Sequence, residues 1–173
     1  LLPYDRQNGY QLDQIKVSFS KIPPDVLVLS HASNVCGVIA PVEQIVACAK
    51  EYNAITVLDL AQTAGLVPLN VGSNDIDYAV FAGHKTLYGP IGIGGFVKKI
   101  DLNPVPILYG GTGVESALQD MPADAPSRYE MGSQNIQAIA GLHAALTWFL
   151  ANMQEIRDAE EKKHQRLISL LQN

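Results

Sequence analysis

The sequence predicts an α/β fold, a three-layer arrangement in which helices pack on a mostly parallel sheet with one antiparallel strand. Two short, continuous apolar runs, residues 26–29 and 55–58, are typical of strands that are covered on both faces. Between them, residues 41–52 carry apolar side chains at helical spacing, which gives the order strand, helix, strand. The 173 residues, 47% of them hydrophobic, suffice for one domain with its own core.

The elements before the second strand follow from local signals. Residues 5–9 include Asn-Gly, which readily supplies the positive φ of a turn, and residues 12–17 predict a short helical link into the sheet. The helix within residues 41–52 begins at Pro41, a residue that the first helical turn tolerates. Its predicted buried face consists of Val42, Ile45, Val46 and Ala49.

Two further strands and a long helical region complete the chain. Residues 78–81 predict a third strand and residues 94–97 a fourth. The connection between them is too short for a parallel crossover, so the fourth strand is predicted to be antiparallel. Residues 135–171 combine an apolar periodic stretch with a charged one, which predicts one or two long helices with a solvated face.

Composition excludes several classes of partner. The net charge is −5 and the 12 basic residues are scattered, so we expect no nucleic-acid partner. No apolar run approaches the roughly 18 residues that a membrane helix requires, and the first residues lack the pattern of a signal peptide. We therefore expect a soluble, cytoplasmic protein without a membrane contact, in which Cys36 and Cys48 are free thiols.

Common ligand motifs are not met. The glycines after residue 88 fail the dinucleotide fingerprint, because Val97 stands where the third glycine is required after Gly92 and Gly94. His84 stands where a phosphate loop needs glycine before its lysine. The cysteines and histidines have no short zinc-site spacing, so we expect no metal, and we interpret His31 as an ordinary packed or surface residue.

Polar residues follow three predicted strands. Asn34 lies shortly after the first strand, Asp59 ends the second, and Lys85 lies just past the third. Ligand-binding residues in open α/β sheets gather beyond the carboxyl ends of strands, so these three loops are predicted to converge on one crevice. A lysine in such a place can act as a covalent nucleophile.

Five segments, in matching order and spacing, resemble the class V aminotransferase family. The likeness is to its cysteine desulfurase branch, within the fold-type I enzymes that use pyridoxal 5'-phosphate (PLP). The resemblance implies that residues 1–173 are part of a PLP-binding large domain, with the N-terminal phosphate loop and C-terminal small domain outside them. The segments are residues 30–37, 59–65, 83–90, 110–113 and 128–135.

The resemblance assigns the catalytic role to Lys85. This lysine would bind PLP as a Schiff base and move the proton at the substrate α-carbon, which requires a depressed pKa. Asp59 would pair with the pyridinium nitrogen of PLP and keep it protonated. Gln62 is similar to the donor to the phenolic oxygen of the cofactor, and Asn34 to its partner near that oxygen.

The remaining implied contacts concern the phosphate of the cofactor. His84 resembles the family's phosphate contact, and Thr112 resembles a residue that reaches the phosphate of a neighbouring subunit, which implies a homodimer. Arg128 matches a family position at the rim of the site. Ala82 departs from the family pattern, which usually has a serine there as a phosphate ligand. Cys36 stands where many relatives have threonine and is not assigned as sulfur acceptor.

The implied function is that of a PLP-dependent cysteine desulfurase-like enzyme. It would convert L-cysteine to L-alanine and pass the sulfur to an acceptor cysteine, with a possible sulfur-acceptor protein as partner. Because the ring-stacking histidine, substrate arginine and sulfur-accepting cysteine fall outside residues 1–173, we expect these residues alone to catalyse poorly. The alternatives are a class V aminotransferase, a selenocysteine lyase, or a catalytically silent PLP-fold module for binding or dimerisation.

Overall fold

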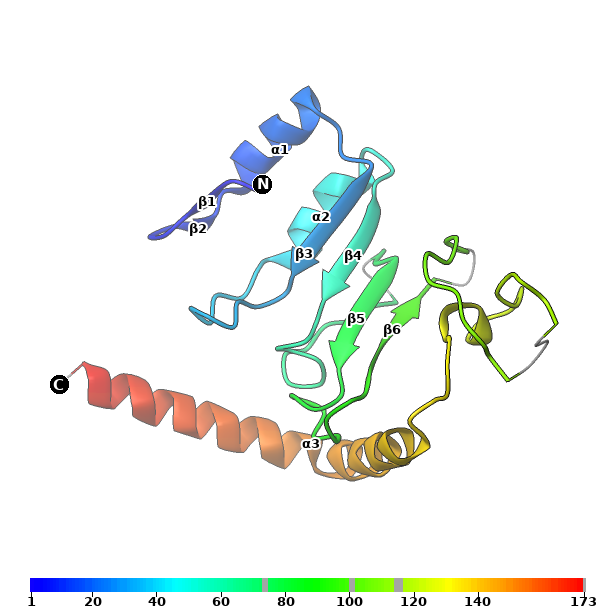
Figure 1. The fold of residues 1–173 in the computed structure, drawn as a ribbon. Helices are drawn as coiled ribbons and strands as arrows, with labels where there is room; N and C mark the ends of the chain where they lie inside the picture. Colours follow the sequence, from blue (N-terminus) through cyan, green and yellow to red (C-terminus); the bar gives the residue numbers. More distant parts are fainter. Residues whose placement is uncertain (73–74, 100–101, 114–116, 173) are drawn as a thin grey trace.

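A four-stranded mixed sheet forms the centre of the molecule (Figure 1). The computed structural model describes residues 1–72, 75–99, 102–113 and 117–172. The order in the sheet is β3-β4-β5-β6, in which the first three strands are parallel and β6 pairs with β5 in the antiparallel direction. The predicted mixed sheet is therefore confirmed. The strands are β3 (Val26–Ser30), β4 (Ile55–Asp59), β5 (Tyr78–Ala82) and β6 (Gly94–Lys98).

A small hairpin and two helices precede or connect these strands. The hairpin pairs β1 (Tyr4–Asp5) with β2 (Gly9–Tyr10) around the predicted turn. Helix α1 (Leu12–Lys21) is longer than the predicted short link, because Ile15 and Phe19, one turn apart, both bury their side chains. Helix α2 (Val42–Lys50) confirms the predicted helix.

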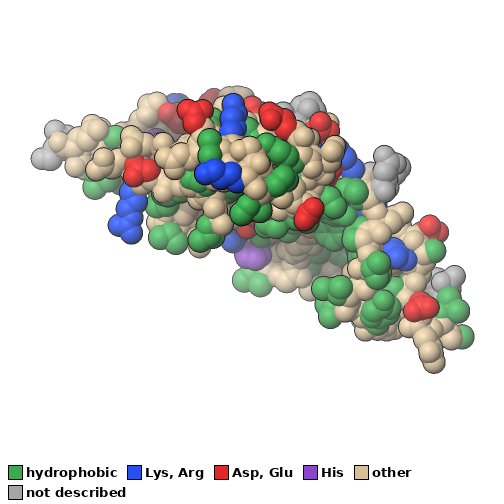
Figure 2. Space-filling model, turned by 90° about the horizontal axis from the view of Figure 1, so that it is seen from above, with side chains coloured by type: hydrophobic (Ala, Val, Ile, Leu, Met, Phe, Trp, Pro, Cys, Tyr) green, Lys and Arg blue, Asp and Glu red, His purple; other side chains and the backbone are tan. Residues whose placement is uncertain are grey.

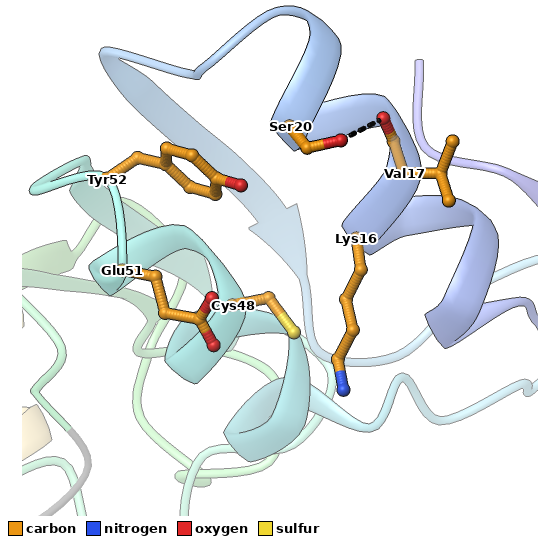
Figure 3. A pocket seen from close by; sticks show the side chains of 6 residues that line it. All are labelled: Lys16, Val17, Ser20, Cys48, Glu51 and Tyr52. Carbon is orange, nitrogen blue, oxygen red and sulfur yellow. Dashed lines mark hydrogen bonds between the residues drawn. The ribbon is translucent and has the colours of Figure 1, made fainter.

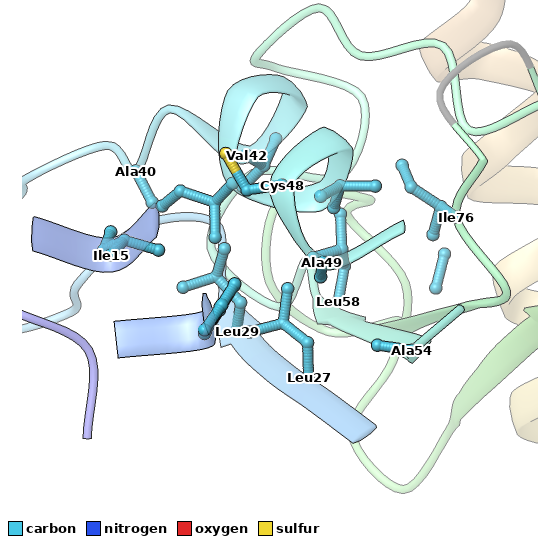
Figure 4. Packing of buried hydrophobic residues seen from close by; sticks show 14 of the residues in the cluster. Ile15, Leu27, Leu29, Ala40, Val42, Cys48, Ala49, Ala54, Leu58 and Ile76 are labelled. Atoms are coloured by element: carbon cyan, nitrogen blue, oxygen red, sulfur yellow. The ribbon is translucent and has the colours of Figure 1, made fainter. Parts of the chain in front are cut away.

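Helix α2 packs on one face of the sheet and α1 packs on α2, and the main core lies between these helices and the strands (Figure 4). Strand β3 alternates: Leu27 and Leu29 point into this core and are buried. Val26 and Val28 face the other way and are 52% and 70% exposed. The α/β class is confirmed, whereas along β3 the described helices cover a single face.

The last element is one continuous helix, α3 (Ile136–Leu171), preceded by the short 3₁₀ helix η1 (Ser127–Tyr129). The Asn135 side chain caps α3 by accepting from the backbone N–H of Ala138 at 3.1 Å. Figure 1 shows α3 passing the edge at which β3, β4 and β5 end.

Helix α3 corrects the expectation that no stretch approaches membrane length. Residues 136–153 contain no Lys, Arg, Asp or Glu, and α3 is long and apolar enough by length and composition to cross a membrane, since its most apolar stretch of 18 residues has a mean hydropathy of 1.2. Gly141 and polar residues such as Gln137, His143 and Asn152 interrupt its apolar ones, which hides the stretch from a search for unbroken runs. A packed helix of a soluble protein passes the same test, so the finding is weak evidence for a membrane.

Candidate functional site

The three predicted loops leave the sheet at one edge. Strand register places Ser30 beside Asp59, and Asp59 beside Val80 on the next strand. The loops that carry Asn34, Asp59 and Lys85 therefore start from neighbouring strands, at their carboxyl ends. We call this the carboxyl edge; the structure brings these residues to it, while their chemical roles stay predictions.

Asp59 is the last residue of β4 and is exposed. By the alternation of β4 its side chain lies on the sheet face opposite α2, like that of Ile55. Its Oδ1 accepts a hydrogen bond from the backbone N–H of Ala61 at 2.8 Å, which orients the carboxylate. Within the described residues no hydrogen bond reaches Oδ2, so this oxygen is available to a protonated ligand nitrogen.

Lys85 lies in a tight turn that follows β5. The backbone N–H of Gly89 donates to the Gly83 carbonyl at 2.7 Å and closes the base of the turn. A second bond runs from the Tyr88 N–H to the Lys85 carbonyl at 3.1 Å. The Lys85 and His84 side chains are exposed, and in the described ranges the Lys85 amine has no hydrogen bond or ion pair. The amine is thus free to react.

A buried pair supports the loop that carries Gln62, which is half-buried. His31 Nδ1 lies 2.9 Å from the Thr63 hydroxyl, and both side chains are buried, His31 being 4% exposed. The His31 backbone N–H also donates to the Asp59 carbonyl at 2.9 Å. Burial lowers the pKa of His31, opposed by the charge of Glu43. His31 is a packed residue, and its link to Thr63 had no signal in the sequence.

Thr112 and Arg128 belong to a different part of the chain. Figure 1 shows the segment between β6 and α3 beyond the β6 edge of the sheet, away from the loops after β3 and β4. Thr112 lines a hollow of about 330 Å³ within this segment. Arg128 donates weakly to the Pro122 carbonyl at 3.4 Å, and its buried Nε has no hydrogen-bond partner among the described residues. Neither residue is brought to the carboxyl edge within one chain.

A separate cavity lies between α1 and α2, about 270 Å³ in volume (Figure 3). Lys16, Cys48 and Glu51 line it, on the helix-covered face and thus on the side of the sheet opposite Asp59. Cys48 and Cys36 are both free thiols, as predicted. In the part of the chain that the structure describes, no group of three or more His, Cys, Asp or Glu could hold a metal ion.

Several curated proteins with similar sequences are named cysteine desulfurases. The chain is 38% identical to the probable cysteine desulfurase 2 of Mycobacterium leprae, over 80% of this chain and 34% of that protein. It is 31% identical to a cysteine desulfurase of Shigella sonnei, over 100% of this chain and 44% of that protein. The chain thus spans less than half the length of these relatives.

Solved structures agree with the sequence relatives. The fold is similar to the apo cysteine desulfurase of Thermococcus onnurineus NA1, with a TM-score of 0.81 and 28% identity over 98% of this chain and 43% of that one. It is also similar to the cysteine desulfurase CsdA of Escherichia coli, with a TM-score of 0.71 and 31% identity over 86% of this chain and 38% of that one. These neighbours support the predicted PLP-enzyme fold.

The evidence for the family is a match along the whole chain, and not a single motif. The description of the matching family is aminotransferase class-V, and the match extends over residues 1–173. Class V aminotransferases and cysteine desulfurases are enzymes that use PLP. The match covers the full length of the chain, and the loops at the carboxyl edge agree with it. The chain therefore belongs to the aminotransferase class-V family.

Proposed function

We propose that this chain contributes the PLP-binding part of a cysteine desulfurase. Such an enzyme converts L-cysteine to L-alanine and transfers the sulfur to an acceptor cysteine. The observation that carries the proposal is that Asp59, the last residue of β4, and Lys85, in the turn after β5, lie at the same edge of the sheet. Among the described residues no hydrogen bond or ion pair reaches the Lys85 amine or Asp59 Oδ2. The names of the similar proteins support the choice of reaction.

The residues at the carboxyl edge fit PLP by their chemistry. An amine can bond the cofactor aldehyde, a carboxylate can accept from the ring nitrogen, and amides can donate to the phenolic oxygen. Lys85, Asp59, Gln62 and Asn34 supply one amine, one carboxylate and two amides at this single edge. The donor set therefore matches the polar groups around the cofactor ring.

Each residue has a defined task in this proposal. PLP, when bound, supplies an electron sink for the negative charge that develops at the substrate α-carbon. Asp59 Oδ2 would hold the proton of the ring nitrogen, while the bond from Ala61 keeps the carboxylate oriented. Lys85 Nζ would take the proton from the α-carbon and return a proton as alanine forms. The thiolate of an acceptor cysteine would attack the substrate sulfur and become a persulfide. The bond between that sulfur and the β-carbon would break with its electron pair left on the carbon side, and the β-carbon would take a proton to become the methyl group of alanine.

We also propose that the active enzyme is a homodimer in which Thr112 serves the neighbouring subunit. The support is that the Thr112 segment lies beyond β6, away from the loops that hold Lys85. Mixing Lys85→Ala protein with Thr112→Ala protein should then give heterodimers with one intact site and partial activity. Full inactivity, despite proven heterodimers, contradicts shared sites.

The full-length protein tests the proposed reaction directly. With PLP and a thiol reductant, L-cysteine should give alanine and sulfide in equal amounts, and the protein should be yellow. A protein that binds PLP but transfers the amino group to a keto acid without releasing sulfide would be an aminotransferase. A protein that binds no PLP would be the silent module, and either result overturns the proposal.

A further inference from the structure

Helix α3 touches both loops that carry the proposed PLP ligands. Phe149 is 2% exposed and lies against Gly65, a glycine three residues beyond Gln62. A Cβ at Gly65 would come within 2.7 Å of Phe149 Cζ, so the backbone of this loop and the ring are in close contact. On the other side, the Phe149 ring stacks on Tyr88 with a centroid distance of 6.0 Å and an interplanar angle of 29°.

Arg157 fastens the same helix to the Gln62 loop. Its Nε and Nη2 donate to the Gly65 carbonyl at 3.2 and 2.7 Å, a contact between residues 92 positions apart. Gly65 has a φ of +81°, in the left-handed region. Hydrogen bonds from a charged donor are stronger than neutral ones, and the planar fork of arginine fits two donors to one site. The arginine thus fixes a backbone carbonyl that follows the Gln62 position.

The Lys85 turn needs an external support. Tyr88 has a φ of +60°, a conformation that a residue with a Cβ rarely adopts and that costs on the order of 1 kcal/mol. Its ring packs edge-on to Trp148 at 5.6 Å, in addition to the stack on Phe149. Leu142, one heptad before Phe149, packs close to Gly89 at the base of the turn. Contacts from α3 therefore hold the turn in this shape.

We propose that Phe149 and Arg157 are positioning residues for the cofactor, and we call them the α3 clamp. One rigid helix contacts the Gln62 loop through Gly65 and the Lys85 turn through Tyr88. The clamp therefore fixes the spacing between the lysine that attaches PLP and the residues that bind its ring. Misplacement of about 1 Å can cost on the order of a hundredfold in rate, so this spacing matters for catalysis. The inference rests on the proposed function.

The test compares Arg157→Gln with Arg166→Gln in the full-length protein. Arg166 lies on the same helix, is exposed, and among the described residues its guanidinium makes no hydrogen bond, so it is a matched control. Arg157→Gln should weaken PLP binding about tenfold by absorbance titration, and it should shift the pH midpoint of the bound cofactor's visible band. Arg166→Gln should change neither quantity.

Hydrogen exchange of the cofactor-free proteins provides a second readout. The backbone N–H groups of Leu66 and Val67, bonded to the Thr63 carbonyl, should exchange faster in Arg157→Gln than in Arg166→Gln. Phe149→Leu should in addition speed exchange at Tyr88. A wild-type protein that binds PLP, together with an Arg157→Gln variant of unchanged affinity and visible band, contradicts the clamp alone. A wild-type protein that fails to bind PLP contradicts the proposed function and the positioning role together.

Discussion

Asp77 and Asp59 stand at opposite ends of the same sheet and have opposite surroundings. Asp77 directly precedes β5, is 6% exposed, and accepts hydrogen bonds from the Thr56 N–H at 2.7 Å and the Thr56 hydroxyl at 3.0 Å. Lys50 forms an ion pair with the same carboxylate oxygen. Asp59 ends β4, is exposed, and has one local bond, from Ala61.

The charges at the amino end of the strands form a small network. Lys99 pairs with Asp75 at 2.8 Å and with Asp77 at 3.4 Å. Burial would raise the pKa of Asp77, but the hydrogen bonds from Lys50 and Thr56 outweigh it and lower the pKa below 3.8. Seen from this side, acidic and basic side chains are interspersed among hydrophobic ones (Figure 2).

The difference separates a stabilising acid from a ligand-binding one. A carboxylate whose lone pairs are taken by the protein can hold strands together, but it has little left for a ligand. A carboxylate that one hydrogen bond orients, and whose other oxygen accepts no bond from the described residues, can bind a ligand with little loss of folding stability. The same residue type thus acts in folding at one end of the sheet and, in our proposal, in chemistry at the other.

The largest effect is expected for Lys85→Ala. In the full-length enzyme it should abolish covalent attachment of PLP and lower desulfuration by about a thousandfold or more, because the amine is both the attachment point and the proton carrier. Its unfolding free energy should stay within about 0.5 kcal/mol of wild type, since the side chain is exposed. Alanine formation and denaturant unfolding measure the two quantities. Turnover near that of wild type in the Lys85→Ala variant would contradict the catalytic role of Lys85.

Asp77→Asn should have the next largest effect, and this effect should be on the stability of the fold. Removing the charge leaves Lys50 half-buried without its partner, which should lower the unfolding free energy by about 3 kcal/mol. Denaturant unfolding of the cofactor-free protein measures this change. A loss below about 0.5 kcal/mol would mean that the amino-end network does not stabilise the fold, and the contrast with Asp59 would collapse.

Asp59→Asn should give the reverse pattern. The fold and much of the PLP binding should remain, while desulfuration falls about a hundredfold, because an amide cannot keep the ring nitrogen protonated. Steady-state alanine formation, compared with denaturant unfolding of the same sample, checks both halves. Turnover near that of wild type contradicts the assigned role.

The smallest effect is a pH dependence of stability near neutrality. Burial holds the folded-state pKa of His31 below 6.5, so the unfolded chain binds more protons between the two values. The His31 contribution is therefore complete above about pH 6.5 and is lost as the pH falls below it. Asp77 has a separate window, because its contribution is lost only as the pH falls below about 3.8. Denaturant unfolding at pH 7.5 and pH 5.5 should show a drop that His31→Gln reduces; an equal drop in the variant contradicts the assignment.

Local patterns predicted the strands well and the long-range contacts poorly. The continuous apolar runs gave β3 and β4 to within one residue, because a short buried strand needs little besides such a run. The length of α1 was underestimated, since Phe19 becomes buried through tertiary packing, which includes an edge-on contact with the distant Tyr52. Arg157 and Gly65 had no local signal at all, because a backbone carbonyl carries no sequence information.

The candidate site shows the same division. The strand-end positions of Asp59 and Lys85 followed from the sequence, because the carboxyl ends of parallel strands meet at one edge. The third helical layer predicted from the apolar runs does not cover β3 in the described residues, since Val26 and Val28 alternate out of the core. Apolar composition indicates that a face is to be covered, but not which segment covers it.

The most direct test of the central claim is to find which lysine binds PLP. The full-length protein is incubated with PLP, reduced with borohydride, digested and mapped by mass spectrometry. The carboxyl edge requires the pyridoxyl label on Lys85, whose amine makes no hydrogen bond or ion pair with the described residues, and a greatly reduced label in the Lys85→Ala variant. A label on Lys50, which pairs with Asp77 at the amino end, or on Lys98 would contradict the account.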